Sequence, residues 1–141
     1  MIISGFFIAV SLALLAYWFR YTCVLILSAR PARNFAAQIA TANQLSFQFV
    51  QNTLELATDV GELDALCREI DRDYMVITCL MRHGAQFREV GQSFEDRMLM
   101  VDFAFLKQMF AFRHSREALR EMAEIVQHFA NQMGECAAAA A

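Results

Sequence analysis

The pattern of hydrophobic and polar residues separates one uniformly apolar segment from several amphipathic ones. From Met1 to Phe19 no side chain is charged at neutral pH, and Ser4 and Ser11 are small. A helix over residues 2–19 would be about 27 Å long, close to the hydrocarbon thickness of a bilayer. Residues 1–29 are therefore predicted to form a single transmembrane anchor with its juxtamembrane extension.

Aromatic residues and a cation follow the apolar run, as is typical of a membrane surface. The predicted membrane-interface anchors are Tyr17, Trp18, Arg20 and Tyr21. A cleaved signal peptide is disfavoured, because the run lacks a charged n-region and a small-x-small cleavage site. Arg20 and both arginines of the ARPAR segment lie on its C-terminal side. The positive-inside rule therefore predicts a single-pass protein of the inner (cytoplasmic) membrane, N-terminus outside and C-terminal domain in the cytoplasm.

Beyond Arg20, the segment TCVLILSA is apolar all round. Either the membrane helix is long and tilted, with Arg20 snorkelling or paired, or the segment leaves the membrane and packs against protein. A helix that is apolar on every side needs a covering in both cases. We therefore expect part of a partner interface at Val24, Leu25, Ile26 and Leu27.

Helical periodicity continues through the rest of the chain, and no useful strand-like alternation occurs. A heptad seam over residues 34–55 carries neutral amides on its opposite face; a second seam runs over 59–83. The pattern Ser93-x-x-Asp96 opens a third helix, and a fourth runs from near Ser115 to Gly134. The prediction is an all-α fold, in which residues 30–135 form an antiparallel bundle of about four helices and residues 136–141 a low-complexity alanine tail.

The third predicted helix carries two apolar stripes. One (Phe94, Met98, Val101, Phe105, Met109 and Phe112) suffices to join the bundle; the other (Leu99, Phe103, Leu106 and Phe110) is surplus. The surplus stripe would cover another helix of the same domain, face a partner subunit, or dip into the membrane interface. We retain its four residues as a candidate partner interface. A second membrane span is disfavoured because Asp102 and Lys107 interrupt the segment.

Asp102 lies between the two stripes and is the candidate buried acid. A carboxylate in a broad apolar arc has to pair with a cation, accept several hydrogen bonds, or take up a proton. The functional interpretation is a proton-linked or partner-locking acid. A structural ion pair with Arg82, Arg88 or Arg113 is favoured over it.

Composition argues against several function classes. Without Arg20, 11 of the 12 basic residues remain against 15 acidic ones, and this acidic balance disfavours nucleic-acid binding. Cys67 and Cys79 stand about 18 Å apart along one helix, too far for a disulfide. The three histidines (His83, His114 and His128) fit surface or capping positions, and the Glu-x-x-His pairs of di-iron bundles are missing. The sequence therefore predicts no catalytic, cofactor-binding or metal-binding residue, no cofactor and no small-molecule substrate.

Three functions from different classes fit these features. The first is a non-catalytic accessory or scaffold subunit of a membrane complex, which contacts lipid and either other membrane-protein subunits or further copies of itself. The second is a homodimeric transmembrane signalling or regulatory module, although almost nothing lies outside the membrane to sense with. The third is a cofactor-carrying electron-transfer subunit. The amide-rich second helix and the surplus apolar surface favour the first.

Overall fold

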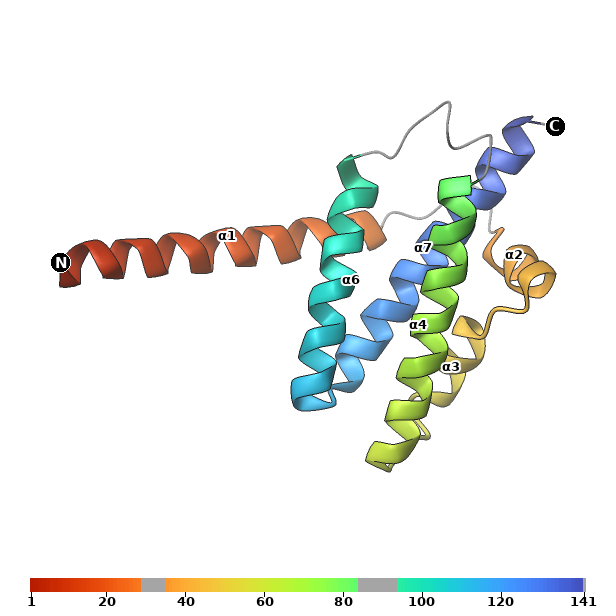
Figure 1. Ribbon diagram of the computed structural model, residues 1–141, viewed down its shortest axis with the longest axis horizontal. Helices are drawn as coiled ribbons and strands as arrows, with labels where there is room; N and C mark the ends of the chain where they lie inside the picture. Colours follow the sequence, from red (N-terminus) through yellow and green to blue (C-terminus); the bar gives the residue numbers. More distant parts are fainter. Residues whose placement is uncertain (29–34, 84–93, 141) are drawn as a thin grey trace. The chain divides into compact units, whose positions relative to one another are not determined.

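The computed structural model describes residues 1–28, 35–83 and 94–140, and the regular elements in these ranges are all α-helices (Figure 1). They are α1 (Ile2–Ser28), α2 (Ala36–Asn43), α3 (Phe47–Thr53), α4 (Val60–His83), α6 (Phe94–Arg113) and α7 (Arg116–Ala140). The predicted all-α fold with a helical bundle is confirmed. The chain forms two compact units, Met1–Arg30 and Pro31–Ala141.

The first unit consists of α1, which is long and apolar enough to cross a bilayer. Its 27 residues correspond to about 40 Å of helix. The hydroxyl of Thr22 donates to the carbonyl of Trp18 at 2.8 Å, and that of Ser28 to the carbonyl of Leu25 at 2.9 Å. These two side chains therefore satisfy their donors within the helix, as an apolar environment requires.

In the second unit α4, α6 and α7 run up, down and up (Figure 1). Asp71 and Lys107 form an ion pair at 3.0 Å, and Nε2 of His114 lies 3.3 Å from Oδ1 of Asp64, so α4 and α6 are antiparallel. The turn from α6 to α7 is tight, because His114 adopts a left-handed conformation with φ 51°. Its backbone N–H donates to the carbonyl of Phe110 at 2.7 Å and ends α6.

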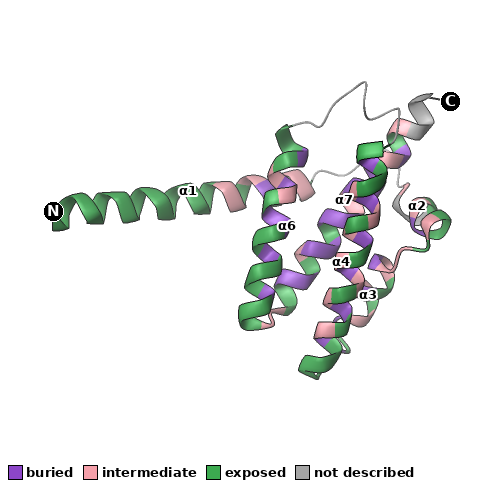
Figure 2. Cartoon of the chain, viewed as in Figure 1, coloured by how far each residue is buried: buried purple, intermediate pink, exposed green. Residues whose placement is uncertain are grey.

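Helix α7 is the centre of this unit, since it packs against α2, α3, α4 and α6. Figure 2 shows buried residues along most of its length. Side chains fully withdrawn from solvent here are Leu119, Met122, Ala123, Ile125, Val126, Phe129 and Ala130. The seam that the sequence predicts over residues 59–83 is confirmed by the burial of Leu63, Leu66, Ile70 and Ile77 in α4.

The prediction of one continuous helix over residues 34–55 is wrong, because the chain breaks between α2 and α3. Gln44 is left-handed (φ 55°, ψ 44°), and its N–H donates to the carbonyl of Ala40. The N–H of Leu45 donates to the same carbonyl at 2.9 Å. The N–H of Ser46 then donates to the carboxylate of Asp73, on α4, at 2.6 Å. A contact with a distant helix therefore overrides the local heptad pattern.

The predicted helix end at Gly134 is also wrong, since α7 continues to Ala140. A Cβ atom at Gly134 would lie 2.1 Å from the Cβ of Phe35. The absence of a side chain at Gly134 therefore leaves room for Phe35, the residue before α2. The N–H of Phe35 donates to Oδ1 of Asn131, one turn earlier on α7, at 3.0 Å. The glycine serves close packing rather than helix termination.

Candidate interaction surface

The two apolar stripes of α6 have opposite environments in the structure. Leu99, Phe103, Leu106 and Phe110 are 0–3% exposed and face the core of their own domain. Their assignment as a partner interface is therefore corrected. Of the three environments that the sequence left open for this stripe, the structure shows the first, in which it covers helices of the same domain. Ser93, expected to cap this helix, lies outside the described residues.

Contacts with α4 fix the rotation of α6 about its axis. The ring of Phe103 stacks on Tyr74 with centroids 3.8 Å apart and planes within 5°. The ammonium of Lys107 reaches the carboxylate of Asp71 at 3.0 Å. Because Phe103 and Lys107 are one turn apart, these two contacts hold the same side of α6 against α4. The other apolar stripe is thereby turned outward.

This outward surface, the outer stripe, is formed by Phe94, Met98, Val101, Phe105, Met109 and Phe112. The three phenylalanines are 76%, 51% and 86% exposed in chain order, and Val101 is 60% exposed. An aromatic side chain carries about 150–250 Å² of surface, so these rings alone expose roughly 400 Å². An apolar patch of this size on one helix is a candidate binding surface.

Asp102 lies on α6 between the stripes and is 0% exposed. Its carboxyl group is thus enclosed within the folded chain. Of the cations expected as its partner, Arg88 lies outside the described residues. The choice between a functional acid and a structural ion pair stays a prediction.

The predicted membrane-interface anchors occupy the C-terminal half of α1. Tyr17, Trp18 and Tyr21 are exposed, and Arg20 lies between the two tyrosines along the same helix. Among the apolar residues that follow, Val24 and Leu25 are exposed, and Ile26 and Leu27 come directly after them in the last turns of α1. Their roles at a membrane surface or a partner interface stay predictions.

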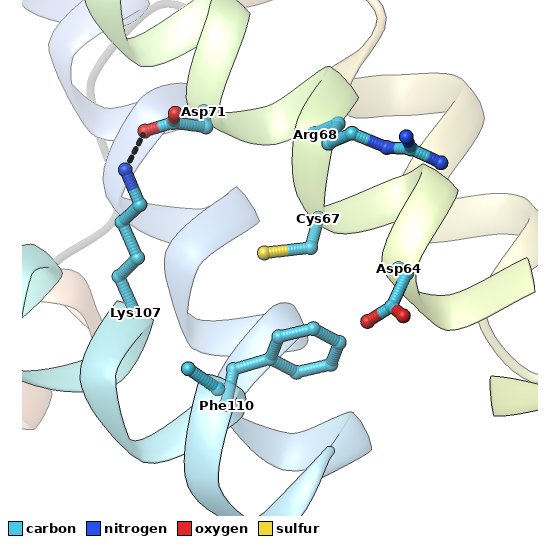
Figure 3. A pocket seen from close by; sticks show the side chains of 7 residues that line it. Asp64, Cys67, Arg68, Asp71, Lys107 and Phe110 are labelled. Carbon is cyan, nitrogen blue, oxygen red and sulfur yellow. Dashed lines mark hydrogen bonds and ion pairs between the residues drawn. The ribbon is translucent and has the colours of Figure 1, made fainter. Parts of the chain in front are cut away.

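A groove of about 370 Å³ between α4 and α6 contains a cysteine, and a cysteine in a groove is a candidate nucleophile. Figure 3 shows the thiol of Cys67 between the Lys107–Asp71 ion pair and the ring of Phe110. Burial, reinforced by the negative charge of Asp71, raises the pKa of Cys67 to about 11. The sulfur is therefore a protonated thiol at neutral pH, which is a poor nucleophile and metal ligand.

Sequence reasoning did not single out Asp73, which is a fully buried carboxylate on α4. It accepts the N–H of Ser46 at 2.6 Å and lies 3.4 Å from the guanidinium of Arg72. Burial raises the pKa of Asp73, although these hydrogen bonds and the arginine oppose the shift. The only sequence signal was its place beside the apolar seam of α4. Its role is to cap α3 from another helix.

Two of the three histidines lie at helix ends, as the sequence predicts, and the third lies within α7. His83 ends α4, and His114 forms the turn after α6, where its ring pairs with Asp64. His128 on α7 is half-buried, and burial lowers its pKa. Among the described residues, no group of three or more His, Cys, Asp or Glu side chains could hold a metal ion.

Comparisons with protein-family models, with curated proteins and with solved structures find no match to this chain. Its function has to be argued from its own surfaces.

Proposed function

We propose that this protein is a non-catalytic, single-pass accessory or scaffold subunit of a larger membrane complex. The observation that carries the proposal is the outer stripe of α6, where three phenylalanines remain exposed although the opposite stripe already supplies the core. A stripe that the domain does not need for its own packing is available to a protein partner.

The proposal places α1 in the inner (cytoplasmic) membrane of a bacterium, with the helical domain in the cytoplasm. Three features support it: the length and apolar character of α1, the aromatic cluster around Arg20, and the arginines that follow the helix. Membrane anchoring confines the domain to a thin layer beside the bilayer. Within this layer, other anchored proteins are met at high local concentration.

The absence of catalysis is part of the proposal, and the chemistry of the α4–α6 groove supports it. A catalytic cysteine needs a thiolate, whereas burial and Asp71 raise the pKa of Cys67 to about 11. The buried carboxylate of Asp73 is engaged with the N–H of Ser46, at the start of α3. Both groups are thereby accounted for as structural features of the domain.

The test is purification of the tagged full chain from native membranes in a mild detergent, followed by light scattering. Wild-type protein is expected in a complex with partner protein. Phe112→Glu, which places a charge on the outer stripe, is expected to release the partner. Met75→Glu is the matched control, because Met75 is exposed on α4, away from the stripe. A monodisperse monomer that carries no partner, or equal capture by both variants, would overturn the proposal.

A further inference from the structure

We infer that the partner of the outer stripe is a second copy of this chain, and that two α6 helices pack side by side as a parallel coiled coil. The inference rests on the proposed function, because it assumes that the stripe binds protein beside the membrane. It adds the identity of the occupant and the relative direction of the two helices.

A heptad seam that follows the outer stripe carries the first step. Steps of four, three, four, three and four residues lead along α6 from Phe94 through Met98, Val101, Phe105 and Gln108 to Phe112. Gln108, at the edge of the outer stripe, takes the place of its neighbour Met109 in this seam. This 3.5-residue repeat places a helix seam against another helix over its full length. Inward-facing residues of α6 are already in the core, so the repeat serves a helix from outside the domain.

The width of the stripe separates a helix partner from a lipid surface. On a wheel with about 100° per residue, the apolar positions of the outer stripe fall within an arc of roughly 80°. Such a narrow arc is typical of a coiled-coil seam, whereas a helix lying in a membrane interface has a broad apolar face. The observations therefore favour a helix as the occupant.

Gln108 favours a second copy of this chain as the partner and a parallel direction for its helix. It is exposed and takes the single polar position in the repeat. In a parallel pair of identical helices the two Gln108 amides face each other, so that each can donate to and accept from its twin. In an antiparallel pair with the same overlap, Gln108 would face Met98, and its amide would lack a partner in the seam. One polar residue in a seam commonly fixes the register in this way.

The size of the surface is sufficient for two anchored chains. The exposed rings contribute roughly 400 Å² from each copy, and Val101, Met98 and Met109 bring the pair to about 1,000 Å² in total. This value lies at the lower limit for a specific complex of freely diffusing proteins. Anchoring of both copies by α1 in one bilayer raises their effective concentration and compensates for the modest area.

The test places the photo-crosslinking residue p-benzoylphenylalanine at position 112 of the full chain in native membranes. One copy is labelled with ¹⁵N, so that crosslinks between copies are distinguished by mass. A parallel pair is expected to give crosslinks from position 112 to the segment around Phe112 of the other copy. The same residue at position 75, in place of the exposed Met75, is the control and is expected to give none.

Each alternative result has a defined meaning. Crosslinks to the segment around Phe94 would show that the two helices are antiparallel and so refute the parallel arrangement. Crosslinks to lipid would refute the claim that a protein covers the outer stripe. Crosslinks to a different protein would overturn the identification of the partner as a second copy of this chain, but would leave the proposed function standing. No crosslink at all would count against both.

Co-purification of two differently tagged copies provides a second measurement. Phe105→Glu in one copy is expected to lower recovery of the other by about tenfold or more, since a charge would be buried in the seam. Met75→Glu is expected to leave recovery unchanged. Equal recovery with both variants would refute the inference, provided that circular dichroism shows both to be folded.

Discussion

Replacement of Gly134 by alanine tests the packing of α7 against the entry to α2. An added Cβ atom would lie 2.1 Å from the Cβ and 2.5 Å from the Cγ of Phe35. These atoms lie close to the backbone, so the clash cannot be relieved by rotation at the end of a side chain. The chain at Phe35 has to move, and the hydrogen bond from its N–H to Asn131 is then stretched or lost.

Two effects of opposite sign decide the result of Gly134→Ala. Alanine favours a helix interior by about 1 kcal/mol relative to glycine. Overpacking costs about 1–3 kcal/mol, and loss of a part-buried hydrogen bond costs about 1 kcal/mol more. We therefore expect a net loss of about 1–3 kcal/mol in the free energy of unfolding. For a domain of this size the midpoint of thermal unfolding would fall by roughly 5–15 °C.

The assay is urea unfolding of the full chain in mild detergent, followed by circular dichroism. Gly61→Ala in the first turn of α4 is the matched control, because an added Cβ would meet only Oδ2 of Asp59, at 3.5 Å. This variant should be stabilised by up to about 1 kcal/mol. In a Phe35→Gly background, Gly134→Ala should lower the free energy of unfolding much less than it does in the wild type, because the Cβ that it would meet is gone. Stabilisation by Gly134→Ala alone would refute the packing argument.

Three further predictions follow from burial and charge. Phe103→Ala, in the core, should lower the free energy of unfolding by about 3–5 kcal/mol, whereas Phe105→Ala, on the outer stripe, should lower it by less than about 1 kcal/mol. Urea unfolding measures both values, and equal losses would contradict the observed rotation of α6. Because burial raises the pKa of Asp73, its contribution to stability is full below its ordinary pKa of 3.8 and declines as the pH rises through the raised value. Unfolding at a series of pH values should therefore show wild type losing stability relative to Asp73→Asn above pH 3.8; parallel profiles would be inconsistent with this. At pH 8 the thiolate fraction of Cys67 should be about two orders of magnitude below that of an unperturbed thiol. Iodoacetamide should therefore modify the exposed Cys79 before Cys67, as followed by peptide mass spectrometry. Equal rates of labelling would exclude a shifted pKa of Cys67.

Sequence periodicity was sufficient to identify the buried faces of α4 and α7, because each helix has one apolar face and one polar face. It was insufficient for α6, where both stripes are apolar and either could face the core. The decision comes from the helices beside α6: α7, against which it packs, and α4, whose Tyr74 stacks on Phe103 and whose Asp71 pairs with Lys107. Neither contact is visible in the local pattern of α6.

The two errors in helix boundaries have a similar origin. The break before α3 depends on Asp73, which lies 27 residues beyond Ser46 in the chain. At Gly134 the glycine leaves room for Phe35, at the other end of the domain sequence, and does not end α7. In both places the local pattern does not reveal the contact with a distant segment that the residue serves. The outer stripe was visible in the sequence, but its exposure required the structure.

The central position of α7 has a consequence for biosynthesis. The helix that contacts α2, α3, α4 and α6 is also the last of them to leave the ribosome. Until it emerges, the apolar faces of α4 and α6 have nothing to close around. Each nascent chain thus passes through an interval of exposed hydrophobic surface, in which chaperones or neighbouring chains compete with α7.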